Sequence, residues 1–94
     1  MDAAWVPSLP RYVKFRFDET RKQWVLLAPE RLLLPDEIAI EILQRVDGRR
    51  SIAEIADNLA DAFDAPRGEI MNDVLEMLRD LAEKGYVVDA HGAR

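Results

Sequence analysis

Residues 24–36 read Trp24-Val25-Leu26-Leu27-Ala28-Pro29-Glu30-Arg31-Leu32-Leu33-Leu34-Pro35-Asp36, and the rest of the chain is arranged around them. Two short apolar runs flank Pro29, and Pro35 with an acidic residue after it ends the second run. Because proline fixes φ and restricts the residue before it, this pattern predicts a strand over 23–28, a corner, and a strand over 31–34. No full partner strand follows in the chain, so the second strand is expected to keep one free edge.

The segment before this stretch is predicted to be another strand. Arg11 to Phe17 alternates in polarity, with Val13, Phe15 and Phe17 on one face, as is typical of a half-buried strand. Asp18 to Lys22 is a polar connection of hairpin length.

Three helices are predicted after the strands. Pro35 suits a first helical turn, and an apolar stripe follows until Asp47-Gly48 stops the helix. Ser51 and Glu54 have the spacing of a capping box that opens the second helix. Ala65-Pro66 ends that helix and opens a third one, which we expect to run to about Lys84. The apolar residues predicted for the first two helices are Ile38, Ile42, Leu43 and Val46, then Ile52, Ile55, Ala56, Leu59 and Phe63.

Strands at one end and helices at the other indicate the α+β class. The second and third helices are joined by a tight turn, so we expect a winged-helix-like domain with a three-stranded antiparallel sheet and three helices over 11–88. Residues 86–88 are a possible short C-terminal strand. Residues 1–10 are expected to be an irregular arm, and residues 89–94 a flexible tail.

Composition limits the function classes. The 94 residues contain no cysteine, which excludes disulfides, thiolate metal sites and iron–sulfur clusters from this chain. No apolar run reaches membrane-spanning length and no secretion signal begins the chain, so we expect a cytoplasmic protein without a membrane partner. Only one histidine, His91, is present, and the four glycines are isolated. These features favour a non-enzymatic protein without a metal or cofactor.

Charge argues against nucleic acid as a partner. Residues 1–31 carry six Lys/Arg and four Asp/Glu, a net of +2, whereas residues 51–94 carry four and ten, a net of −6. A helix-turn-helix needs positive charge to meet phosphates, and the third helix here has a net charge of −2.

An extended peptide is a better fit, because it can pair with the free edge of the strand at 31–34 while the third helix forms the other wall of a groove. The apolar arc of that helix is wider than one buried face requires. Arg31 would then meet an acidic ligand side chain, and Asp73 and Glu76 basic ones. The pattern alone leaves open an acidic winged-helix module that binds another protein and no precursor peptide.

Several runs resemble the PqqD family of pyrroloquinoline quinone (PQQ) biosynthesis. The resemblance covers about residues 9 to 88, and its most specific part is the Trp-Val-Leu-Leu-Ala-Pro-Glu run. The runs are Arg11-Tyr12-Val13, Trp24 to Arg31, Pro35-Asp36, Asp47-Gly48-Arg49-Arg50-Ser51, Ala65-Pro66, and Asp73-Val74-Leu75-Glu76-Met77-Leu78.

The resemblance implies a recognition element of the kind used for ribosomally synthesised and post-translationally modified peptides (RiPPs). Such a peptide chaperone binds a precursor peptide of the PqqA type as an added strand and presents it to a radical S-adenosylmethionine (SAM) enzyme of the PqqE type. The expected assembly is a monomer or a strand-exchanged homodimer hinged near Pro35. The predicted peptide-binding residues are Arg31, Leu32, Leu33, Leu34, Ile70, Asp73, Val74, Met77, Leu78 and Leu81.

Overall fold

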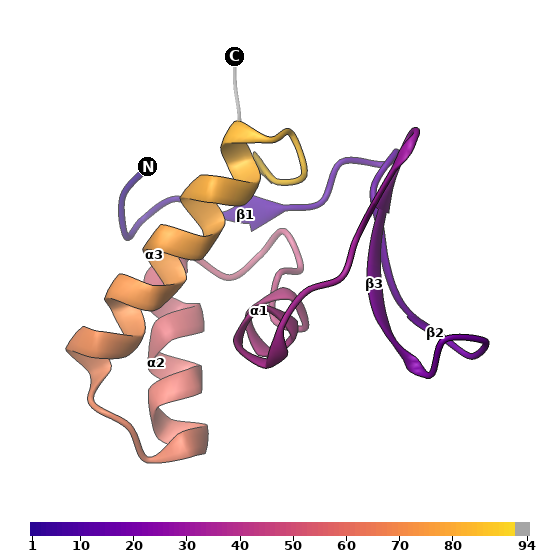
Figure 1. The fold of residues 1–94 in the computed structure, drawn as a ribbon. Helices are drawn as coiled ribbons and strands as arrows, with labels where there is room; N and C mark the ends of the chain where they lie inside the picture. Colours follow the sequence, from indigo (N-terminus) through magenta and orange to yellow (C-terminus); the bar gives the residue numbers. More distant parts are fainter. Residues whose placement is uncertain (92–94) are drawn as a thin grey trace.

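The computed structural model describes residues 1–91 and contains two small sheets and three helices (Figure 1). The class is α+β, as predicted. In chain order the elements are β1 (Pro7–Ser8), β2 (Lys14–Asp18), β3 (Gln23–Ala28), β4 (Arg31–Leu33), α1 (Glu37–Leu43), α2 (Ile52–Phe63), α3 (Arg67–Glu83) and β5 (Val88–Asp89). The β2–β3 hairpin stands to one side of the three helices in Figure 1, and β1 pairs with β5, which follows α3 in the chain.

The three predicted strands form an antiparallel sheet in the order β2-β3-β4. β3 has its predicted bounds, and β4 ends one residue early, at Leu33. β2 begins at Lys14 rather than Arg11, because the Val13 N–H donates to the Pro10 carbonyl in a turn. Ala28 pairs with Arg31, so only two residues connect β3 and β4.

The expectation of an irregular arm was wrong for Pro7–Ser8. These two residues form β1 and pair with β5, so the last strand joins the arm instead of the three-stranded sheet. The arm also accepts hydrogen bonds at the start of α2: the Ile52 N–H donates to Trp5 and the Ala53 N–H to Ala3, each at 2.9 Å. Those donors have no partner within their own helix, so the arm completes the N-terminus of α2.

α1 is shorter than its apolar stripe predicted. Asp36 is its N-cap and accepts a 2.8 Å bond from the Ala39 N–H, so Pro35 lies outside the first turn where it was expected. The helix ends at Leu43. Ile42 and Leu43 are buried, but Ile38 is 59% exposed. The predicted stripe therefore does not lie entirely against the core.

α2 and α3 make most of the helical core. The Ser51–Glu54 capping box is present, and Gly85 follows α3 with a positive φ of 85°. Pro66 is the N-cap of α3 and provides no side-chain bond there. Phe63, predicted on the buried side of α2, is 55% exposed. The fully buried centre joins the sheet to all three helices through Leu26, Ile42, Ile52, Ile55, Ala56, Val74 and Leu78.

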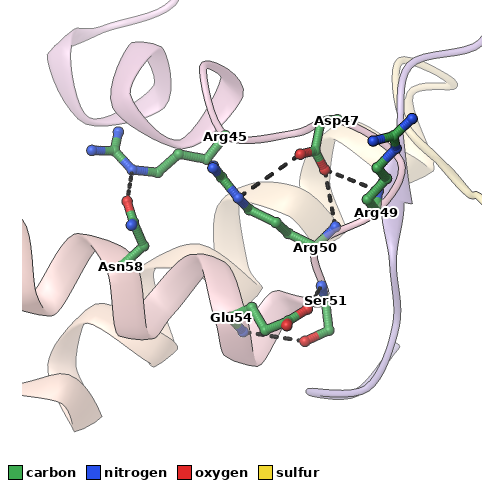
Figure 2. Close-up of polar contacts among 7 residues, drawn as sticks. All are labelled: Arg45, Asp47, Arg49, Arg50, Ser51, Glu54 and Asn58. Carbon is green, nitrogen blue, oxygen red and sulfur yellow. Dashed lines mark hydrogen bonds and ion pairs between the residues drawn. The ribbon is translucent and has the colours of Figure 1, made fainter.

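The loop between α1 and α2 is built around Asp47 (Figure 2). Its carboxylate accepts bonds from the backbone N–H groups of Arg49 and Arg50, both at 2.9 Å, and the Gly48 N–H donates to the Pro7 carbonyl in the arm. The bonds from Arg50 and then Arg49 lower the pKa of Asp47 below its ordinary value of 3.8. No helix within residues 1–91 is both long and apolar enough to cross a membrane.

Asp47→Asn tests this loop through pH. A carboxylate with a lowered pKa in the folded state stabilises the protein above its unfolded-state pKa, and this contribution disappears as pH falls through the folded pKa. We expect the variant to unfold at lower urea concentration than the parent at pH 7, and the difference to vanish well below pH 3.8. If the difference in urea midpoint between the parent and Asp47→Asn stays constant as pH is lowered, the Asp47 carboxylate does not stabilise the loop in the way described.

Candidate functional site

β4 is an edge strand of the three-stranded sheet. Within the described residues it pairs with β3 on one side and with no strand on the other, which agrees with the predicted free edge. In an antiparallel pair, successive residues turn their polar groups alternately toward and away from the partner strand. If Ala28 and Arg31 exchange the bonds that close their two-residue turn, Leu32 turns its N–H and C=O toward the open edge.

The three leucines that follow Arg31 differ in environment. Leu33 packs against the core, whereas Leu32 is 41% and Leu34 is 51% exposed. Pro35 then ends the edge, because it has no N–H to offer a paired chain. The edge is therefore short, and a chain paired with it must leave it near Leu34.

Arg31 connects β4 to the C-terminal end of α3. Its guanidinium donates a 2.7 Å bond to the Lys84 carbonyl and lies 4.9 Å from the centre of the Tyr86 ring. Helix ends leave carbonyl groups without partners, and a cation is favoured there by the helix dipole. The structure thus gives Arg31 a role within the fold, where the sequence predicted contact with an acidic ligand.

The predicted residues of α3 separate into a buried and an accessible group. Val74 and Leu78 are fully buried and Leu81 is 3% exposed, so these three side chains belong to the core, and their contact with a peptide stays a prediction. Their spacing along α3 directs them into the core. The accessible group is Ile70 and Met77, both partly buried, and Asp73, which is exposed.

A hollow of about 390 Å³ lies where α1 begins beside α3. Met77, Asp73 and Glu76, which the sequence interpretation placed near a ligand, line it together with three residues that it did not select. The sequence does contain an indication for the residues on α3, because the spacing of positions 73, 76, 77 and 80 places them on one face of a helix. The lining residues are Asp36, Ile38, Asp73, Glu76, Met77 and Asp80.

The hollow is acidic. Asp80 accepts a 3.0 Å bond from Lys84, and the Asp36 carboxylate caps α1. Among residues 1–91 the ion pairs leave Asp73 and Glu76 without a cationic partner. An extended chain with basic and apolar side chains suits this surface. Within the same residues, no group of three or more His, Asp and Glu side chains is arranged to hold a metal ion.

Comparison with known proteins gives one consistent family. The profile of the family described as Coenzyme PQQ synthesis protein D (PqqD) matches residues 23–87. Two proteins named PqqA binding protein are similar over 89% of this chain and 82% of their own length: one from Rhodopseudomonas palustris strain HaA2 is 60% identical, and one from Bradyrhizobium diazoefficiens is 54% identical.

Two solved structures are also similar, each at 44% sequence identity. The solution structure of the PqqD truncation of Methylobacterium extorquens PqqCD, described as a functional, stand-alone RiPP recognition element, gives a TM-score of 0.79 over 93% of both chains. The crystal structure of PqqD from Xanthomonas campestris gives 0.57 over 89% of this chain and 93% of that one.

Arg31→Lys tests the connection between β4 and α3. Lysine keeps the charge but loses the planar group that bonds the Lys84 carbonyl and faces Tyr86. We expect the free energy of unfolding to fall by about 0.5–1 kcal/mol in urea denaturation. Arg79→Lys, at an exposed position of α3, is the matched control. If Arg31→Lys and Arg79→Lys lower the free energy of unfolding equally, Arg31 does not stabilise the connection between β4 and α3.

Proposed function

We propose that this chain, which belongs to the PqqD family, is a non-catalytic peptide chaperone that binds a precursor peptide of the PqqA type. The observation that carries the proposal is the open edge of β4, which Arg31 holds to the end of α3. Relatives that are 60% and 54% identical to it over 84 residues are named for binding PqqA. The known recognition-element fold supports the same role.

The peptide would bind as an added strand on β4. Main-chain bonds of this kind supply affinity without depending on the peptide sequence, and pockets for side chains supply specificity. Leu32 is expected to contribute the N–H and C=O of this pairing. The exposed Leu32 and Leu34 side chains would contact the peptide, while Leu33 keeps β4 against the core.

α3 would contact the peptide through its accessible residues. Met77 offers a flexible apolar side chain, which adapts to varied partners, and Asp73 and Glu76 offer negative charge to basic residues. Ile70 extends the apolar surface toward the start of α3. A peptide with alternating apolar and basic side chains would complement this face of α3.

The bound peptide would then be presented to a radical SAM enzyme of the PqqE type. Holding a flexible substrate beside the enzyme raises its effective concentration, which requires no chemistry from the chaperone itself. The two alternatives for assembly, monomer or strand-exchanged homodimer, stay predictions.

Leu32→Pro tests strand addition directly. Proline removes the expected edge N–H but is tolerated in edge strands, so the fold should persist. We expect affinity for a synthetic PqqA-type precursor peptide, measured by calorimetry, to fall by about 1 kcal/mol or more. Leu32→Ala keeps the N–H and truncates the side chain, and it should lose less. Equal losses would exclude main-chain pairing at Leu32. No binding to the parent would instead favour an acidic module that recognises another protein.

Met77→Glu tests the α3 wall. A carboxylate there adds like charge to an acidic hollow and removes an apolar contact, so peptide affinity should fall by more than about 1 kcal/mol. Asn72→Glu adds the same charge at an exposed position about 140° around the helix, and it serves as the matched control. Unchanged affinity in a folded Met77→Glu protein would remove Met77 from the site.

A further inference from the structure

A second hollow, of about 360 Å³, lies between α1, α2 and α3, and we refer to it as the three-helix groove. Its walls are mainly apolar. Ile38 comes from α1, Phe63 from the last turn of α2, and Ile70 from the first turns of α3. Nothing in the peptide-pairing role of β4 requires this groove.

Helical periodicity predicted that two apolar side chains that border this groove are buried, but in the structure they are exposed. Ile38 is 59% and Phe63 is 55% exposed, although each lies on the apolar stripe of its helix. α1 has seven residues, and the last turn of α2 stays uncovered at Phe63. Single exposed apolar residues are ordinary, but these two border one continuous apolar hollow, which is typical of a binding surface.

The charge of the residues that line the groove indicates which kind of ligand complements it. Its lining includes Glu37, Glu41 and Asp73 and contains no lysine or arginine. Glu41 already accepts a 3.0 Å bond from Arg45, which leaves Glu37 and Asp73 to face a ligand. An occupant with a large apolar side chain next to a basic residue therefore complements the groove. A second copy of this chain fits poorly, since its helical half carries a net charge of −6.

The three-helix groove is continuous with the proposed peptide site. Ile38 and Asp73 line both the groove and the acidic hollow beside α3. A peptide paired with β4 must leave the edge near Pro35, and the chain from Pro35 leads directly to Ile38. Ile38 and Asp73, which line one hollow with Asp36, therefore lie near the point where one end of the peptide would leave the edge.

We propose that the three-helix groove binds the part of the precursor peptide that flanks its strand-forming segment. One large apolar side chain of this flank inserts between Ile38 and Phe63, and a neighbouring basic residue faces Glu37 and Asp73. This inference rests on the proposed peptide-binding function and adds a second, side-chain-specific contact to it. The flank contributes affinity because it is tethered to a segment that is already bound.

Phe63→Ala provides the test, with two peptides as probes. One is a full synthetic PqqA-type precursor, and the other is the shortest truncation that still protects the Leu32 amide from exchange. We expect Phe63→Ala to weaken the full peptide about tenfold, as for a truncated interface anchor, and to leave the truncation unchanged. Tyr12→Ala, which removes an aromatic ring of similar exposure (54%) outside the groove, should bind both peptides like the parent.

Glu37→Gln is a second variant that keeps every apolar wall. It should weaken only the full peptide, by a few-fold, and the loss should shrink in high salt because the contact is between charges. Full-peptide affinity equal to that of the parent in both variants would overturn the groove proposal while strand addition stands. So would a Phe63→Ala effect confined to docking of the radical SAM enzyme, or to self-association in sedimentation. Failure of the parent to bind either peptide would overturn the proposed function itself.

Discussion

The two-residue turn at Pro29-Glu30 is the constraint on which the rest of the structure depends. Proline supplies the negative φ of the first turn position, and Glu30 has a positive φ of 62°, the combination found in type II turns. This turn sets the register of β4, so that Leu33 faces the core beside Leu26. A slip of one residue would exchange Leu33 with Leu32, burying the residue that now faces outward.

Pairing with β3 alone would leave β4 attached to the fold on one side only, but Arg31 gives β4 a second attachment, to the end of α3. The guanidinium joins the first residue of β4 to the carbonyl of Lys84, the C-cap of α3, and covers the Tyr86 ring. The first residue of β4 is thereby tied to the C-terminal end of α3, a helix whose exposed face carries Met77 and several carboxylates. Edge strands left uncovered promote unspecific pairing, and nearby charges of one sign restrict which chains can approach.

The sequence predicted well those elements that are determined by residues close together in the chain. Gln23–Ala28, the Ser51–Glu54 capping box and the glycine after α3 follow from side-chain pattern and backbone freedom. The pairing of β1 with β5 has no such signal, because two-residue strands show no period and their bonds come from the backbone.

The exposure of Phe63 was missed for a different reason. Periodicity shows which face of α2 is apolar, but it does not show how far the other elements cover that face, and Phe63 stays 55% exposed. The buried residues of α3 were predicted as site residues because one apolar arc contains both core and groove positions. The packing of α3 against the rest of the core, mainly α2, decides that Val74 and Leu78 are buried while Met77 is only partly buried.

The proposed site would divide peptide recognition between two kinds of contact. A three-residue edge can offer very few main-chain bonds, and each contributes only about 1 kcal/mol net. Such an edge binds weakly and accepts almost any extended chain. In the proposed mode of binding, specificity would therefore come from side chains in the two hollows, whose carboxylates would favour basic peptides and oppose acidic ones. Because these charges are exposed, their contribution decreases as salt rises, whereas that of the strand edge does not.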